Sequence, residues 1–298
     1  MVESEKWKGK TGGRFLGQKS LIVLFKLVNI RIGYFLMALV VPFYMVFAPK
    51  RARAIYRYFR KQFNYSGCKS FRKTYKNHFV FGQVILDRFA VFAGNKNLFE
   101  MEIEGYEHFS RLENAEKGFI IASSHIGNFE IGGYLLHSKN KKMNALVYAG
   151  ETKTVQSNRV KILETHNINL IPVLDDMSHL FAVNTTLQNG EIVTMPCDRN
   201  LGSAKSVECD FLNGKADFPI GAFALAATFD VEVLAVFIIK KSSKKYKVYV
   251  QPVKIERKCG ETKHEIIENY VRSYVKEVES IVRKYPEQWF NYYEFWKK

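Results

Sequence analysis

A histidine and a glutamate five residues apart, His125 and Glu130, are the residues whose types and spacing best suit catalysis. The apolar residues 119–122 before them predict a buried strand, and residues 128–137 after them predict a helix. Residues five apart on a helix point about 140° away from each other, so we expect His125 in the turn and Glu130 in the first helical turn, reaching back. A carboxylate placed there would fix the tautomer of a histidine that acts as a general base.

The rest of this turn agrees with proton transfer from a hydroxyl group. Gly127 would allow a substrate to approach closely, and the start of the helix would offer unpaired N–H groups to a developing oxyanion. Asn128 is a substrate-binding candidate in the same turn. The alternative is a surface histidine beside an unrelated helical glutamate, since His108 and Glu113 have the same spacing without a preceding apolar strand.

The elements that would position these residues alternate between short apolar runs and segments of helical periodicity. This alternation predicts an α/β fold with a mixed, mostly parallel sheet flanked by helices. The expected strands cover residues 119–122, 145–148, 170–173, 192–195, 231–239 and 247–250. The expected helices cover residues 69–93, 128–137, 154–166, 177–188, 220–229 and 263–284.

The N-terminal part of the chain differs from the rest in texture. Residues 32–48 contain no charged side chain and reach the lower limit of length for a membrane span. Some thirty polar or mixed residues precede them and no cleavage site follows, which argues against a signal peptide. We therefore predict a hydrophobic membrane-anchoring helix in a segment that covers residues 1–63, followed by a catalytic domain over residues 64–298. A buried core helix is the alternative for the apolar run.

Charge and cysteine content narrow the choice of partners. The 298 residues contain 45 Lys and Arg but only 29 Asp and Glu, a net charge of +16. Such an excess predicts attraction to an anionic partner. Basic and aromatic residues mixed over residues 50–63 suit an anionic membrane surface. They would also suit single-stranded nucleic acid, but no nucleic-acid-binding signature accompanies them, so we expect no nucleic acid. The four cysteines lack metal-ligand spacing.

Several motifs, taken in order, resemble the lysophospholipid acyltransferase superfamily, and within it the lipid A late acyltransferases (lauroyl and myristoyl transferases). The N-terminal apolar segment comes first and is followed by the strand and turn that carry His125-x4-Glu130. Downstream matches are residues 195–202 (MPCDRNLG), 211–214 (FLNG), 221–226 (GAFALA) and 286–290 (PEQWF). Ser124 stands where the glycerol-phosphate acyltransferases usually have Asn, which favours the lipid A branch.

The resemblance implies a glycerol-phosphate-acyltransferase-like fold and a membrane-bound acyltransferase. His125 would deprotonate the acceptor hydroxyl for attack on an acyl thioester, with Glu130 as its partner and with neither metal nor cofactor. The donor would be acyl carrier protein or CoA, and the acceptor a lipid A precursor, as in lipopolysaccharide synthesis. Phospholipid, amino-acid lipid and pigment acceptors stay open. A thioester donor places the catalytic domain on the cytoplasmic face of the inner membrane.

Further candidates for substrate binding follow the strand over residues 192–195. Arg199 could bind a phosphate or the pantetheine arm through bidentate contacts, and Asp198 and Arg159 join it as candidates. The alternative is that Asp198 and Arg199 pair with each other at a loop. The C-terminal aromatic residues 289–296 could touch acyl chains, although packing onto the domain is the favoured interpretation.

Two other classes of protein compete with a transferase. An esterase or thioesterase could use His125 and Glu130 to activate water, or Ser123 or Ser124 as a nucleophile, but the chain has no G-x-S-x-G motif. A non-catalytic membrane-surface binding protein would share the charge but would have no use for a histidine and a glutamate at the end of a strand.

Overall fold

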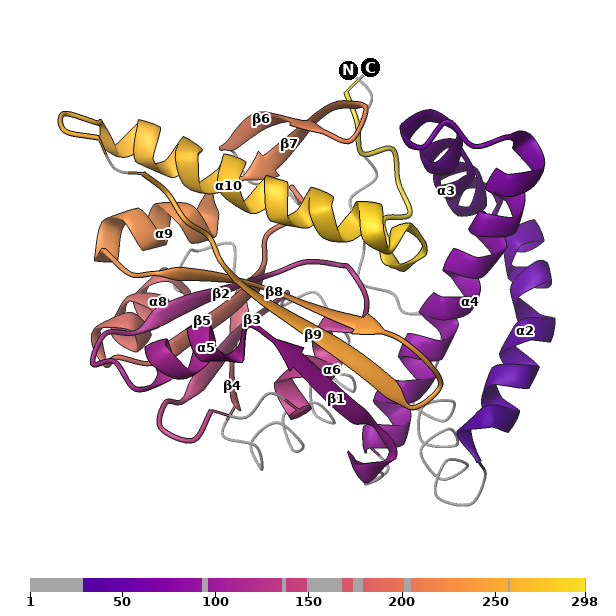
Figure 1. Cartoon of the computed structure of the whole chain (residues 1–298), viewed down its shortest axis with the longest axis horizontal. Helices are drawn as coiled ribbons and strands as arrows, with labels where there is room; N and C mark the ends of the chain where they lie inside the picture. Colours follow the sequence, from indigo (N-terminus) through magenta and orange to yellow (C-terminus); the bar gives the residue numbers. More distant parts are fainter. Residues whose placement is uncertain are drawn as a thin grey trace.

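The computed structural model of the chain is built around a seven-stranded sheet, shown in Figure 1. The structure describes residues 29–92, 96–135, 138–148, 168–173, 179–200, 205–256 and 258–297. The strands of this sheet are β1 (Glu100–Glu104), β2 (Phe119–Ser123), β3 (Met143–Tyr148), β4 (Ile168–Val173), β5 (Ile192–Pro196), β8 (Val233–Lys240) and β9 (Lys245–Pro252). The predicted helix over residues 154–166 lies outside the described residues.

The order of the strands is β1-β9-β8-β2-β5-β3-β4. Neighbouring strands are parallel except β8 and β9, which form an antiparallel pair. Central β2 and β8 are buried along their whole length, as expected for strands covered on both faces. The structure thus confirms the predicted mixed, mostly parallel sheet, and each of the six expected strands is present with shifted ends.

Helices cover both faces of the sheet because side chains alternate between the faces along each strand. One face packs against α8 (His179–Gln188), α9 (Gly221–Phe229) and α10 (Lys263–Lys284). The opposite face packs against α5 (Tyr106–Glu113), α6 (Phe129–Leu135) and the second half of α4 (Gly67–Phe92). A capping box formed by Thr262 and Glu265 begins α10. The predicted bounds of α10 match those observed.

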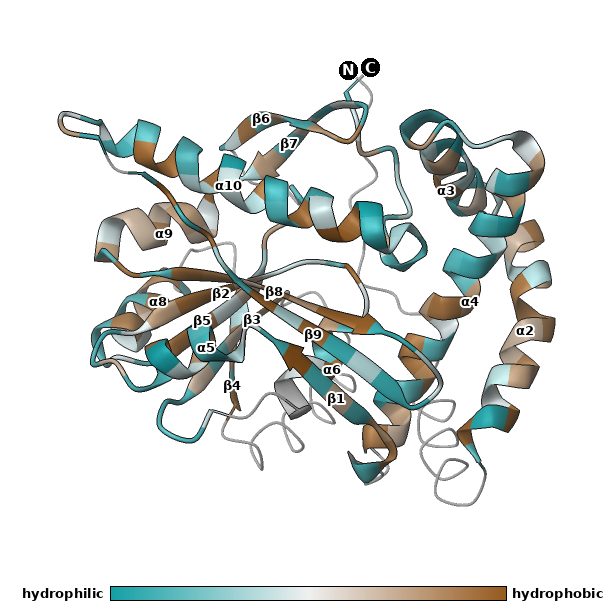
Figure 2. Ribbon diagram, in the orientation of Figure 1, coloured by the Kyte–Doolittle hydropathy of each residue, from teal (hydrophilic) through white to brown (hydrophobic). Residues whose placement is uncertain are grey.

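The apolar N-terminal run forms α2 (Ile30–Phe47), and α3 (Pro49–Gln62) follows it. Figure 2 shows α2 as a predominantly hydrophobic helix beside the more polar α4. Three contacts spread along α2 hold it against α4. The Tyr34 hydroxyl bonds to Asp87, the Tyr75 hydroxyl donates to the carbonyl of Ala38 at 3.0 Å, and the rings of Tyr44 and His78 lie 5.8 Å apart. One face of α2 therefore packs on the domain while most of the helix stays exposed.

A buried ion pair connects α4 to the sheet. Lys240, the last residue of β8, donates to the Asp87 carboxylate, which also accepts from the hydroxyls of Tyr34 and Tyr246. The side chains of Lys240 and Asp87 are 4% and 0% exposed. Each buried charge is thus paired and hydrogen-bonded, as a stable buried charge has to be.

Several elements were not predicted from the sequence, among them helix α5. Charged β1 alternates glutamates with apolar residues and forms an edge strand beside β9. The hairpin of β6 (Ser206–Phe211) and β7 (Gly214–Pro219) forms a separate two-stranded sheet. Two 3-10 helices, η1 (Lys96–Leu98) and η2 (Pro286–Gln288), are too short to give a periodic pattern.

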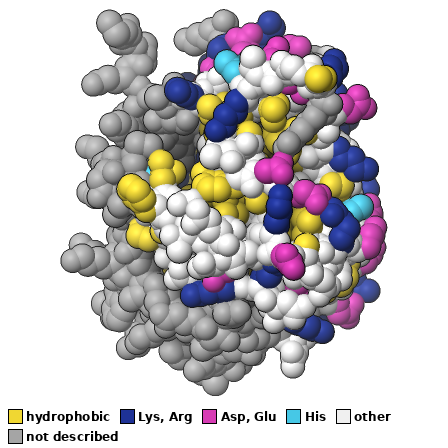
Figure 3. Space-filling model, turned by 90° about the vertical axis from the view of Figure 1, so that its left-hand side faces the viewer, with side chains coloured by type: hydrophobic (Ala, Val, Ile, Leu, Met, Phe, Trp, Pro, Cys, Tyr) yellow, Lys and Arg dark blue, Asp and Glu magenta, His cyan; other side chains and the backbone are white. Residues whose placement is uncertain are grey.

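The side of the molecule shown in Figure 3 carries basic and acidic side chains interspersed with small apolar patches. By contrast, α3 exposes six basic side chains and contains no acidic one. The exposed basic residues of α3 are Lys50, Arg51, Arg53, Arg57, Arg60 and Lys61. Net positive charge is therefore concentrated on the N-terminal helices rather than spread evenly over the described surface.

Candidate active site

The ends of two neighbouring parallel strands bring the central residues of the site together. Ser123, the last residue of β2, is in register with Pro196, the last residue of β5. Beyond them the amide of Cys197 donates to the carbonyl of Ser123 at 2.8 Å. The carboxyl ends of parallel strands meet at one edge of a sheet, where α/β proteins place their functional side chains. His125 and Asp198, each two residues past its strand, therefore become neighbours.

His125 and Asp198 form a doubly bonded pair. The ring Nδ1 of His125 lies 2.7 Å from Asp198 Oδ1, and the backbone N–H of His125 donates to Oδ2 at 2.9 Å. The indole Nε1 of Trp289 donates to the same Oδ2 at 3.3 Å. Asp198 is completely buried, whereas 18% of the His125 side chain is exposed. The carboxylate is thus closed off, and the imidazole lies between it and the surface.

The charge state of Asp198 depends on these contacts. Burial alone would raise the pKa of Asp198, but the attraction of His125, its hydrogen bonds and the nearby Arg199 guanidinium outweigh burial and lower that pKa. Asp198 is therefore ionised at neutral pH. An ionised carboxylate only accepts hydrogen bonds, so Nδ1 of His125 must carry the proton of this bond. In the neutral ring, Nε2 is then the basic nitrogen.

Glu130 lies in the first turn of α6, where the sequence predicted it, but its bonded partner differs from the prediction. Its Oε2 accepts from Nη1 of Arg88 on α4 at 2.5 Å. The predicted contact with the ring nitrogen that fixes the tautomer is made by Asp198, because the strand end of β5 reaches His125 from the adjacent position in the sheet. A catalytic role for Glu130 stays a prediction.

The turn between β2 and α6 is held by the protein itself. Asn128 is 1% exposed and donates to the Tyr246 hydroxyl at 3.1 Å, so its side chain helps to hold the turn. Its role as a substrate ligand stays a prediction. Gly127 has φ +61°, and a Cβ there would lie 2.0 Å from the carbonyl oxygen of Ile238. Close approach of β8, not of a substrate, requires this glycine.

Three N–H groups in the turn and at the start of α6 are engaged within the protein. The amide of Gly127 donates to Gln288 and that of Asn128 donates to Ile238, both at 2.7 Å. The amide of Ile131 donates to the carbonyl of Asn128 at 3.2 Å. These three groups therefore hold the turn in place rather than face a reacting carbonyl.

Of the two arginines predicted to bind substrate, the structure describes Arg199. Arg199 donates from Nη2 to the carbonyl of Phe290 at 2.7 Å, while the Asp198 carboxylate bonds to His125 and Trp289. The alternative of a direct Asp198–Arg199 pair is therefore not what the loop forms. Arg199 is partly exposed next to the site, and its role in binding substrate stays a prediction. Arg159 lies outside the described residues.

Ser124, considered as a nucleophile, is 1% exposed and so closed to a substrate. Among the C-terminal aromatic residues, Trp289 and Phe290 pack onto the domain, in agreement with the favoured interpretation, whereas Tyr293 is 42% exposed. The Trp289 and Phe290 side chains are 1% and 4% exposed. Sequence reasoning missed the contact of Trp289 with Asp198, since 91 residues separate the two positions.

With this geometry in view, comparison with known families is decisive. A family model of bacterial lipid A biosynthesis acyltransferases matches residues 74–298. The chain belongs to this family. It is an acyltransferase, and the strand-end histidine that the sequence analysis singled out lies within the matched residues. The family and the apolar helix α2 together indicate association with a membrane.

Two further comparisons accompany the family assignment. None of the curated proteins matches this acyltransferase significantly. Among solved structures, it is similar to the crystal structure of the 1-acyl-sn-glycerophosphate (LPA) acyltransferase, PlsC, from Thermotoga maritima. The identity is 14%, the match covers 88% of this chain and 99% of that chain, and the TM-score is 0.39.

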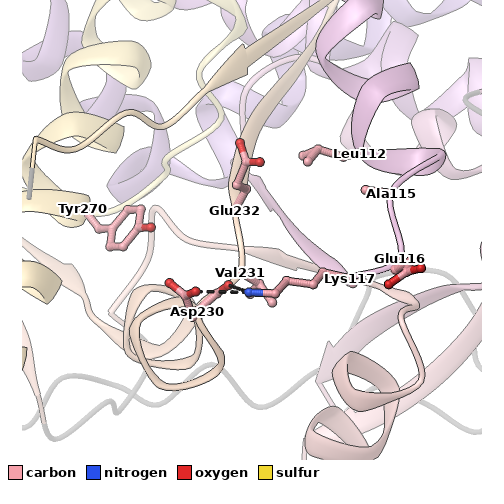
Figure 4. Close-up of a pocket in the computed structure, with 9 residues that line it drawn as sticks. Leu112, Ala115, Glu116, Lys117, Asp230, Val231, Glu232 and Tyr270 are labelled. Atoms are coloured by element: carbon pink, nitrogen blue, oxygen red, sulfur yellow. Dashed lines mark hydrogen bonds and ion pairs between the residues drawn. The ribbon is translucent and has the colours of Figure 1, made fainter.

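A surface depression of the acyltransferase lies at the other end of the sheet, near the starts of β2 and β8. Figure 4 shows its lining, which includes Tyr270 and an ion pair between Lys117 and Asp230 at 3.1 Å. Residues at the amino ends of β2 and β8 are separated from His125 by the length of the strands. This depression is therefore distinct from the site that contains His125.

Proposed function

We propose that the protein transfers a fatty acyl chain from an acyl carrier protein thioester to a hydroxyl group of a lipid A precursor. The observation that carries the proposal is the His125–Asp198 pair, with Nδ1 bonded at 2.7 Å to a buried carboxylate and the imidazole partly exposed. This is the arrangement of a general base that is held in one tautomer. The family assignment supplies the class of reaction.

The proposed reaction needs one base and no covalent acyl-enzyme. Nε2 of His125 removes the proton of the acceptor hydroxyl while the oxygen attacks the thioester carbonyl carbon. The tetrahedral intermediate then expels the thiolate as its C–S bond breaks, and the imidazolium returns the proton to that sulfur. Asp198 stays ionised throughout and stabilises the imidazolium. Atoms and charge balance without a metal or a cofactor.

The choice of donor rests on charge. The chain has a net charge of +16, and the exposed face of α3 is basic without any acidic residue. A small acidic carrier protein would be steered toward such a surface more strongly than toward a neutral one. CoA thioester is the alternative that the assay below distinguishes. The phosphates of a lipid A precursor suit the same basic environment, with Arg199 as the described candidate to bind one.

The test compares wild type with His125→Ala in detergent, with labelled acyl carrier protein or CoA thioester and the lipid extract of a strain that lacks the gene. Mass spectrometry of the lipids should show an acyl-shifted phosphoglycolipid that is absent with the variant. Acylated phospholipid, amino-acid lipid or pigment would change the acceptor. Free fatty acid alone would favour a hydrolase, and equal products from both proteins would overturn the assignment of His125.

We also propose that α2 lies along the membrane surface rather than crossing it. Its 18 residues span roughly 27 Å, yet one face packs lengthwise on α4. A crossing would draw α4, with its charged Lys76, Asp87 and Arg88, into the hydrocarbon layer at high cost. The opposite face exposes Ile32, Phe35, Leu36, Leu39, Val40, Phe43, Val46 and Phe47. A half-buried helix with basic α3 beside it suits a membrane rich in anionic lipid.

This orientation can be tested at the two ends of α2. Single cysteines at Asn29 and Lys50, exposed residues just outside the two ends of α2, are introduced in a background with the exposed Cys68 and Cys259 replaced by serine. They are labelled with an impermeant maleimide in inverted inner-membrane vesicles. Both ends should react from the cytoplasmic side. Reaction of one end only after the vesicles are opened would show that α2 crosses the membrane.

A further inference from the structure

The C-terminal segment 286–290 runs beside the turn that carries His125. Gly127 donates its amide to the carbonyl of Gln288 at 2.7 Å, and Phe290 donates its amide to the carbonyl of His125 at 2.9 Å. Ile126 and Trp289 face each other in an isolated antiparallel bridge between them. The backbone of the candidate base is thus paired with the backbone of a segment more than 160 residues later in the chain.

The side chain of Trp289 extends this pairing to the carboxylate. Its indole is 1% exposed, and its N–H points to Oδ2 of Asp198 at 3.3 Å, the oxygen that also accepts the amide of His125. An indole nitrogen only donates hydrogen bonds, so Trp289 favours the ionised carboxylate. Asp198 consequently has two donors on Oδ2 and the imidazole on Oδ1, which leaves its carboxylate plane little freedom to turn.

The segment is itself anchored to two elements, α4 and β8. Asn77 of α4 donates to the carbonyls of Glu287 and Trp289 at 3.1 and 2.9 Å. The side-chain amide of Gln288 pairs with both backbone groups of Lys240, at 2.9 and 2.8 Å. Lys73 of α4 bonds to the Glu287 carboxylate. These contacts fix the position of Trp289 relative to α4 and to β8 rather than leaving it on a free terminus.

We infer that Trp289 is a positioning residue for the acyl transfer, acting by holding the Asp198 carboxylate in the plane and charge state that orient His125. The inference rests on the proposed role of His125 as general base. We expect the indole N–H of Trp289, and not only the bulk of its ring, to contribute to kcat. Without this donor, the negative charge of the Asp198 carboxylate attracts the His125 ring more strongly, which favours the protonated ring.

Trp296 provides a matched control for this hypothesis. Its ring lies 5.6 Å from that of Trp289 in the same aromatic cluster, and its indole N–H donates to the carbonyl of Phe211 at 2.9 Å. Replacing either tryptophan by phenylalanine removes one indole N–H and part of one packed ring. Only the Trp289→Phe variant removes a donor from Asp198.

The experiment compares kcat, KM and the pH profile of both variants with wild type in detergent. Trp289→Phe should lower kcat about tenfold, as expected for a lost hydrogen bond to a charged group, with KM unchanged and the acidic limb of the profile moved to higher pH. Trp296→Phe should keep kcat and the profile. Equal kcat and equal profiles for the two variants would overturn the inference.

A second measurement separates this inference from the proposed function. In protein labelled with ¹³C at histidine Cε1, the resonance missing from His125→Ala identifies His125, and its titration needs no turnover. The midpoint should rise in Trp289→Phe and stay unchanged in Trp296→Phe. If Trp289→Phe fails to fold, benzothienylalanine at position 289 keeps the bicyclic shape without the N–H. A normal titration there would overturn the inference and leave the proposed function intact, whereas full activity of His125→Ala would overturn the proposed function whatever the titration showed.

Discussion

Two buried carboxylates of this acyltransferase are built alike and behave differently. Asp87 accepts from two tyrosines and Lys240, and Asp198 accepts from Trp289 and twice from His125. Burial raises the pKa of Asp87 by more than its partners lower it. At Asp198 burial acts in the same direction, but the partners outweigh it and the pKa is lowered. The number of bonds alone therefore does not set the charge state.

The two pairs differ in how exposed the partner of the carboxylate is. The Lys240 side chain is 4% exposed, so its ammonium is enclosed between α2, α4 and β8, whereas 18% of the His125 side chain is exposed. An enclosed pair can only connect elements, while a pair with one exposed member can exchange a proton with a substrate. The comparison predicts that damage to one pair affects stability and damage to the other affects turnover.

The largest effect on turnover is expected from His125→Ala. Loss of the general base should lower kcat by about 10³-fold. The folded state should lose less, because Asp198 keeps the backbone amide of residue 125 and the Trp289 indole as hydrogen-bond donors. Acyl transfer and differential scanning fluorimetry on the same preparation check both parts. If the variant loses activity only as much as it loses folded protein, His125 is structural and the two pairs do not differ in function.

The opposite pattern is expected for Lys240→Met. It leaves Asp87 buried without its cation and should cost about 3–5 kcal/mol of unfolding free energy, with kcat per folded molecule retained. Urea titration measures the loss. Lys247→Met is the control, since Lys247 bonds to Glu102 at an exposed edge of the sheet and its removal should hardly matter. Equal unfolding free energies of both variants would show that the buried Lys240–Asp87 pair does not stabilise the fold.

Smaller losses of kcat are expected from changes to the two carboxylates in this region, Asp198 and Glu130. Asp198→Asn removes the acceptor that fixes the Nδ1 proton and should lower kcat about 10²-fold. Glu130→Gln weakens the ion pair with Arg88 and leaves the bond between Asp198 and His125 in place, so we expect a smaller loss. Steady-state kinetics of the two isosteric variants decide the order. The reverse order would return Glu130 to the role that the spacing from His125 first predicted.

The smallest effect is a dependence of stability on pH. The folded pKa of Asp198 lies below the unfolded value of about 3.9, so its ionised form stabilises the fold above that pH. This contribution disappears as the pH falls through the folded pKa. The difference in unfolding free energy between wild type and Asp198→Asn should therefore shrink below about pH 4. A difference that is constant from neutral to acidic pH would show that the charge of Asp198 is not what stabilises the fold.

Local sequence predicted the parts of the molecule whose pattern is contained in one segment. The buried strand over residues 119–122, the long helix Lys263–Lys284 and the position of His125 at a strand end all follow from periodicity. The edge strand Glu100–Glu104 does not, because its charged residues pair with lysines of β9 that only the sheet brings near.

The site illustrates the same division. His125 was predicted from a strand, a turn and a helix, but the choice between Glu130 and Asp198 as its partner depends on strand order. Only the adjacency of β2 and β5 places residues 123 and 196 side by side. Trp289 reaches the pair through a segment after the last helix, and the roles of Asn128 and Gly127 depend on β8. No single window of sequence contains such contacts.

The pairing of residues 125–127 with residues 288–290 also has a consequence for biosynthesis. Apolar α2 leaves the ribosome before the strands of the sheet, so it can meet a membrane while most of the domain is still untranslated. The contacts that complete the site have a sequence separation of more than 160 residues, and such distant contacts form late in folding. A nascent chain would thus reach the membrane surface well before its active site is complete. Truncation by about a dozen residues at the C-terminus would leave a protein that binds the membrane but does not catalyse acyl transfer.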